Sequence, residues 1–142
     1  MGTEILDARL NARLSRRVKT DLTALARRRR QDESELARTL LDEGIRRENH
    51  PGIVFRPGAG GRDAAIEGRR LYIWQVMETV WNSDGNVEDA AASLGIRADQ
   101  VEAATGYYLD YPEEIDAAIA SNQEEADRLR ELAQRRAKAA RH

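Results

Sequence analysis

Apolar and polar residues alternate strictly along the stretch from Asp7 to Ser15. The apolar positions are Ala8, Leu10, Ala12 and Leu14, and the polar positions between them are Arg9, Asn11 and Arg13. Because successive side chains of a β-strand point to opposite faces, this period of two predicts a strand over about residues 7–14. One face of that strand would be apolar, and the other would carry two arginines and an asparagine.

The spacing of apolar residues becomes helical directly after this strand. A helix is predicted from about Arg16 to Arg30, with one apolar face made of Val18, Leu22, Leu25 and Ala26. A second helix is predicted from about Asp32, since Asp32 and Glu35 form a D-x-x-E variant of the capping box. Its apolar stripe is Leu36, Leu40, Leu41 and Ile45, with Gly44 near its expected end and Pro51 preventing continuation.

The pattern of residues 50–142 predicts a small hairpin followed by helices. A short strand is expected at about residues 53–56, then a turn at "PGAGG", then returning strands within residues 62–73. Helices are expected over residues 72–81, 87–95, 98–111 and from about Glu113 onward. Trp74 and Trp81 lie seven residues apart on one helical face, which predicts that both belong to the core. The fold class is therefore expected to be mainly α.

We expect three parts in this chain of 142 residues: 1–48, 49–112 and a long C-terminal helix at 113–142. Aromatic residues make up only 5% of the chain and charged residues 34%, which argues against one large core. Two small helical units with a modest core, completed by dimerisation, fit this composition better. Pairing of dimers into tetramers is left open by the sequence.

The charge of the chain is divided sharply between two regions, although the formal net charge is only −2. Between Arg9 and Arg30, nine basic residues stand against Asp21 alone, a net charge of about +8. Between Trp74 and Asp127, thirteen acidic residues stand against Arg97 alone, a net charge of about −12. The basic region suits a polyanion such as nucleic acid, and the acidic region does not.

The predicted N-terminal strand needs a second strand, because one strand with two short helices cannot close a core. Pairing with the same strand of a second copy would give a two-stranded ribbon whose outer face presents Arg9, Asn11 and Arg13 twice. Such a ribbon fits the major groove of DNA, where arginine can bind guanine and asparagine can bind adenine. Surrounding arginines such as Arg16 and Arg17 would neutralise phosphates. The alternative is an ordinary solvated strand face beside a solvated basic helix.

The run "ARLSRRVKTDLTALARRRRQDESELARTLLDEGI" resembles the ribbon-helix-helix repressors of the MetJ/Arc/CopG type over about residues 7–47. The resemblance implies a dimeric β-α-α fold that reads an operator through Arg9, Asn11 and Arg13. It also implies that the backbone at the start of the second helix, around Asp32 to Ser34, binds a phosphate. The chain departs from the family at Ser15, where proline is common, at the Arg30–Gln31 turn, where glycine is common, and in the acidic "DES".

Residues 50–116 resemble a second family, of small bacterial helix-turn-helix-like domains of unknown function. The shared features are the hairpin after "HPG", the run "GRRLYIWQVMETV" and the motif "YYLDYPEEI". This family is commonly encoded beside toxins with PIN-like nuclease folds, so the resemblance implies a VapB-type antitoxin. Because the would-be recognition helix is acidic, we expect partner binding or dimerisation here before a second DNA contact.

The long C-terminal helix is expected to contact a partner through a thin apolar seam. The candidate contact residues are Ile115, Ile119, Leu129 and Leu132. The alternative, that Ile115 and Ile119 pack within their own domain, is at least equally good.

No pattern in the chain indicates catalysis. There is no cysteine, and the two histidines, His50 and His142, form no recognisable metal or nucleophile motif. No cofactor and no metal are expected. The sequence lacks a signal-peptide core or an apolar run long enough for a membrane, which predicts a cytoplasmic protein. The expected function is a DNA-binding antitoxin that represses its own operator; the alternatives are a stand-alone dimeric repressor and an interaction protein that binds no DNA.

Overall fold

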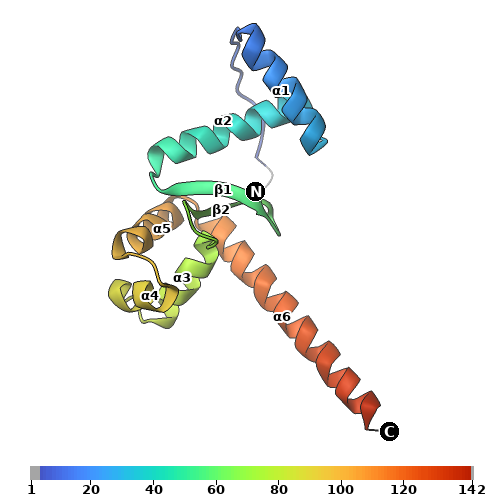
Figure 1. Cartoon of the computed structure of the whole chain (residues 1–142), viewed down its shortest axis with the longest axis vertical. Coiled ribbons are helices and arrows are strands. Elements are labelled where there is room, and N and C mark those ends of the chain that lie inside the picture. Colours follow the sequence, from blue (N-terminus) through green and yellow to red (C-terminus); the bar gives the residue numbers. More distant parts are fainter. Residues whose placement is uncertain (1–3, 142) are drawn as a thin grey trace. The chain divides into compact units, whose positions relative to one another are not determined.

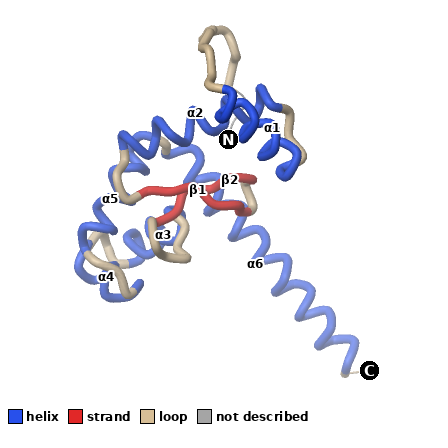
Figure 2. Tube along the Cα trace, turned by 45° about the horizontal axis from the view of Figure 1, so that its top comes forward, coloured by secondary structure: helices blue, strands red, loops and turns tan. Residues whose placement is uncertain are grey.

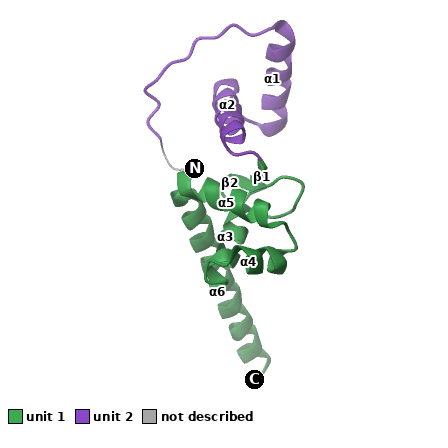
Figure 3. Cartoon of the chain, turned by 90° about the vertical axis from the view of Figure 1, so that its left-hand side faces the viewer, with its two compact units in different colours: residues 1, 52–142 green, residues 2–51 purple. Residues whose placement is uncertain are grey.

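The structure is a computed structural model that describes residues 4–141. Within this range the chain forms six α-helices and one two-stranded antiparallel sheet, so the mainly α fold class is confirmed (Figure 1). The described residues divide into an N-terminal unit, residues 4–51, and a C-terminal unit, residues 52–141 (Figure 3). None of the described helices combines the length and apolarity needed to span a membrane.

Two helices make up the regular structure of the N-terminal unit: α1, Arg16–Arg29, and α2, Glu33–Asn49. Ser15 caps α1, because its hydroxyl oxygen accepts a hydrogen bond from the Val18 amide at 3.2 Å. Arg30 ends α1 in the left-handed conformation, φ 53° and ψ 48°, at the turn where glycine is common in the ribbon-helix-helix family. Both predicted helices are confirmed, and α2 continues through Gly44 to Asn49.

The strand predicted over residues 7–14 is absent from the single chain. Residues 4–15 form no regular element and are drawn as the loop that precedes α1 in Figure 2. All their side chains are exposed. The physical reason is that a strand is held by hydrogen bonds to a neighbouring strand, and the described part of the N-terminal unit contains no other strand. An alternating sequence indicates that a segment can form a strand, but it does not identify the strand with which that segment pairs.

The apolar core of the N-terminal unit is very small. Among its described residues, only Ala26 and Leu36 are buried apolar side chains. Large apolar side chains are instead exposed to solvent: Ile5, Leu6, Leu10, Leu14, Val18, Leu40, Leu41 and Ile45. This unit therefore leaves most of its apolar surface without a covering element within the single chain.

The C-terminal unit begins with the predicted hairpin, which is confirmed. Strands β1, Ile53–Gly58, and β2, Gly61–Ile66, pair antiparallel, with Ile53 opposite Ile66 and Gly58 opposite Gly61. Gly61 has φ 99°, a conformation that favours glycine and allows the tight turn. Apolar residues of both strands pack against the helices of the unit.

Four helices complete the C-terminal unit: α3, Ile73–Asn82, α4, Val87–Leu94, α5, Ala98–Asp110, and α6, Pro112–Ala140. Their core includes Ile73, Val76, Val101 and Tyr107, each 0% exposed. The prediction that both tryptophans are core residues is wrong for Trp81, which is 45% exposed, whereas Trp74 packs partly buried against the core. Trp81 lies at the end of α3, in its last turn.

Candidate functional site

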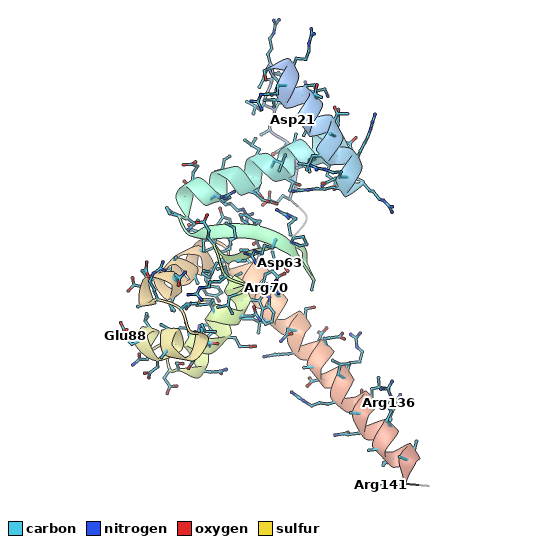
Figure 4. All side chains as sticks on the ribbon, in the orientation of Figure 1. Asp21, Asp63, Arg70, Glu88, Arg136 and Arg141 are labelled. Atoms are coloured by element: carbon cyan, nitrogen blue, oxygen red, sulfur yellow. The ribbon has the colours of Figure 1, made fainter. Side chains whose placement is uncertain are left out.

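The residues predicted to read DNA lie together at the beginning of the described chain. Arg9, Asn11 and Arg13 are exposed in the segment before α1, and Arg16 and Arg17 begin that helix. Arg17 lies 3.5 Å from Asp21, an ion pair between two side chains that are 80% and 68% exposed; Figure 4 labels Asp21 on α1. Within residues 4–141, Arg9, Arg13 and Arg16 form no ion pair, so their charges are available to a ligand.

The hydrogen bonds at the start of α2 weigh against the phosphate clamp predicted at Ser34. The Asp32 carboxylate accepts hydrogen bonds from the backbone amides of Ser34, at 3.1 Å, and Glu35, at 3.3 Å. These amides are the groups that would have to bind a phosphate, and they are already satisfied by a carboxylate of the same charge sign. Ser34 is exposed, but its amide belongs to the helix cap.

A link between α1 and α2 was not predicted from the sequence. Lys19 donates a hydrogen bond to Glu33 at 2.6 Å, and the Thr23 hydroxyl donates to the same carboxylate. The bonds from Lys19 and Thr23 lower the pKa of Glu33 below its ordinary value of 4.5. Lys19 and Glu33 are 14 positions apart, beyond the spacing at which a single helix brings charges together, so only the fold reveals the pair.

Helix α2 has apolar residues on two different sides. Leu36 is buried within the chain, while Leu41 and Ile45 are rotated from it by about 140° and about 180° around an ideal helix. Leu41 is 50% exposed and Ile45 is 52% exposed. The second side of α2 therefore forms an apolar face that nothing within the described residues of its unit covers.

The helix-turn-helix-like part of the C-terminal unit is acidic on its surface. Helices α4 and α5 are joined at Gly95, which has φ 68° and ends α4 in the left-handed conformation. Arg97, the lone basic residue between Trp74 and Asp127, lies 2.9 Å from the Asp99 carboxylate. Exposed carboxylates of these helices are Glu88, Asp89, Asp99, Glu102 and Asp110, of which Figure 4 labels Glu88. This surface would repel a nucleic-acid backbone.

An aromatic pair lies at the surface where α3 meets α5. The rings of Trp81 and Tyr108 are in edge-to-face contact, with centroids 5.3 Å apart. The Tyr108 hydroxyl donates a hydrogen bond to Asp116 at 2.9 Å, and this bond, with desolvation, raises the pKa of Tyr108 above 10.0. The seven-residue spacing predicted Trp81 to lie in the core, so this surface pair was not predicted from the sequence.

The four predicted partner contacts on α6 fall into two groups, one buried and one exposed. Ile115 and Ile119 are 4% and 9% exposed and belong to the core of their own unit, so the prediction that they contact a partner is wrong. Helix α6 packs against α3 and α5, whose buried residues belong to the same core cluster. Leu129 and Leu132 are 58% and 43% exposed, on the part of α6 that extends beyond the other helices of the unit (Figure 3).

No protein-family model matches the chain, and a search of curated proteins found no match. Among solved structures, the chain is similar to the crystal structure of a DUF433 member protein from Anabaena variabilis. The two chains are 22% identical, the TM-score is 0.42, and the similarity covers 75% of this chain and 99% of the other.

Proposed function

We propose that two copies of the protein join their N-terminal units into a dimer in which residues 7–14 pair as an antiparallel ribbon. The observation that carries this proposal is the exposed apolar surface of the N-terminal unit. Leu10 and Leu14 alternate with polar residues along the segment, and Leu41 and Ile45 lie on the uncovered side of α2. A ribbon with its apolar side against the paired α2 helices would cover both sets.

The exposed apolar surface would contribute to holding such a dimer together. Six side chains would contribute, with exposed fractions between 37% and 73%: Leu10, Leu14, Val18, Leu40, Leu41 and Ile45. Full burial of a large aliphatic side chain stabilises by about 1.5–3 kcal/mol, so covering the exposed half of each contributes roughly 1 kcal/mol. The sum is roughly 6 kcal/mol per copy, of which part is offset by ordering the two segments.

The opposite side of the ribbon would bind DNA in the major groove. In this proposal Arg9, Asn11 and Arg13 contact base edges, and Arg16 and Arg17 contact phosphates. Two features support it: the net charge of about +8 between Arg9 and Arg30, and the lack of ion pairs at Arg9, Arg13 and Arg16 within the described chain. Ser34 is left out of the interface because its amide is bonded to Asp32.

DNA binding is tested by measuring the affinity of the full chain for the DNA upstream of its own gene. The upstream DNA should bind more tightly than unrelated DNA of equal length, and the affinity should fall steeply with salt. Arg13→Ala should reduce the preference for the upstream DNA, by about 1–3 kcal/mol for each arginine that contacts a guanine. Arg141→Ala, which removes an equal charge at the other end of the chain, is the control. Equal affinities for Arg13→Ala and the unchanged protein would refute the ribbon as the reader.

We further propose that the protein is the antitoxin of a toxin–antitoxin pair and neutralises a PIN-like nuclease. The support is the acidic surface of α4 and α5, where Arg97 is already bonded to Asp99. A nuclease binds a polyanion through a basic groove, and an acidic surface can occupy such a groove. The protein would then act in the cytoplasm as both inhibitor and repressor.

A stand-alone dimeric repressor is the second candidate, since the DNA-binding proposal does not need a toxin. The reading frame beside the gene separates the two: a small PIN-like nuclease there favours the antitoxin. If it is present, the full chain should bind that nuclease, and neutralising Asp99→Asn with Glu102→Gln should weaken binding, while Glu131→Gln on α6 should not. Nuclease binding without DNA binding would favour an interaction protein that binds no DNA.

A further inference from the structure

The last two thirds of α6 form a helix with little support from its own unit. Beyond Ile119 every described side chain of α6 is exposed except Ala126, which is partly buried. Residues 121–141 span about 30 Å at the rise of an α-helix. Two ion pairs within this stretch, Glu125 with Arg128 at 3.4 Å and Asp127 with Arg130 at 2.8 Å, contribute only about 0.2–0.5 kcal/mol each. A helix of this kind gains most of its stability from packing against another element.

The buried face of α6 continues as an apolar seam along the exposed stretch. The seam consists of Ala126, Leu129, Ala133, Ala137 and Ala140, all within about 80° of one another on an ideal helix. Ile115 and Ile119, which are buried in the core, lie on the same line. Leu132 lies next to Leu129 at the edge of the seam. Alanine along most of the seam allows a second helix to approach closely.

The exposed stretch also carries opposite charges at its two ends. Its first part is acidic, with Glu124, Glu125 and Asp127, and its last part is basic, with Arg135, Arg136, Lys138 and Arg141. Figure 4 labels Arg136 on α6 and Arg141 directly after its end. Two such helices side by side in the same direction would place like charges together. In opposite directions they would place the acidic end of each beside the basic end of the other.

We infer that α6 pairs antiparallel with α6 of a second copy through this seam. If residues 121–141 of the two helices overlap fully, Leu129 lies opposite Ala133 of the second copy. Glu125, on the flank of the seam, then lies beside Arg136 of the second copy, and this contact occurs twice. This interface is separate from the proposed N-terminal dimer and joins two such dimers into a tetramer. It leaves the acidic surface of α4 and α5 uncovered.

The interface is tested by measuring the particle mass of the full chain across a range of concentrations. Leu129→Asp places a carboxylate in the seam, so the dissociation constant for pairing should rise roughly tenfold or more and the particle mass should fall by half. Gln134→Asp adds the same charge outside the seam and should leave the mass unchanged. Equal particle masses for Leu129→Asp and Gln134→Asp would overturn the inference. This result would also be obtained if the seam binds only a different protein.

The direction of pairing is tested by exchanging the charges that flank the seam. Glu125→Arg alone and Arg136→Glu alone should each weaken pairing, because each places like charges beside one another. The combined variant should restore the mass of the unchanged protein. If the combined variant is as weak as either single variant, the antiparallel arrangement is wrong. DNA affinity measured on Leu129→Asp distinguishes this interface from the proposed function, since the N-terminal dimer and its ribbon are retained.

Discussion

Leu41→Ala tests whether the exposed apolar side of α2 is a dimer surface. Leu41 is 50% exposed and lies on the side of α2 away from the buried Leu36. In the single chain it is only partly packed, so its truncation should change the folding of the unit little. If the same side chain is covered by a second copy, its truncation should weaken dimerisation.

The magnitude follows from the exposed fraction of the side chain. Full burial of a leucine contributes about 1.5–3 kcal/mol, and covering the remaining half contributes about 1 kcal/mol. The substitution occurs once in each copy, so the dimer should lose about 2 kcal/mol. A loss of this size raises the dissociation constant roughly 30-fold.

Sedimentation equilibrium of the full chain measures this change, in a Leu129→Asp background so that only one interface between copies remains. Glu35→Ala, a polar truncation on another side of the same helix, is the matched control and should leave the dissociation constant within about threefold. Circular dichroism checks that helix content is retained. A dissociation constant for Leu41→Ala within threefold of the unchanged protein would refute the idea that this side of α2 is a dimer surface.

Three further substitutions test the two units separately. Arg30→Gly should stabilise the N-terminal unit by up to about 1 kcal/mol in denaturant unfolding, because Arg30 holds the left-handed conformation that glycine adopts without strain; a loss of stability would contradict this. Glu33→Gln should destabilise the N-terminal unit at about pH 7 and have no effect well below the lowered pKa of Glu33. The stability contributed by a carboxylate with a lowered pKa is present above its unfolded pKa, near 4.5, and is lost as the pH falls through its folded pKa. A difference in stability that does not change with pH would show that the ionised carboxylate is not the cause. Ile73→Ala, at a fully buried position of the C-terminal unit, should cost about 2–5 kcal/mol in thermal or denaturant unfolding, and a cost below about 1 kcal/mol would place Ile73 outside the core.

The helices and the hairpin could be predicted from the sequence because each carries its signals locally. Asp32 marks the start of α2 through a cap that the structure contains, and the turn after Pro57 joins two paired strands. These features depend on residues within a few positions of one another, so no knowledge of the remaining chain is needed.

The misassigned residues depend on what lies beside them in space. A seven-residue spacing places Trp74 and Trp81 on one side of α3. It does not indicate how far the neighbouring helices extend along that side, and Trp81, in the last turn of α3, is exposed. The same holds for Ile115 and Ile119, which continue the seam of α6 in the sequence and are covered by their own unit. The alternation of residues 7–14 likewise specifies a strand without specifying the strand it pairs with.

The pairing of residues 7–14 between two copies can be measured directly by NMR on a mixture of isotope-labelled and unlabelled chains. If the ribbon forms, the backbone of residues 8–14 in one copy should contact the same segment in the other, and the paired amide protons should exchange slowly. Fast exchange throughout this segment, with no contacts between copies, would contradict the pairing.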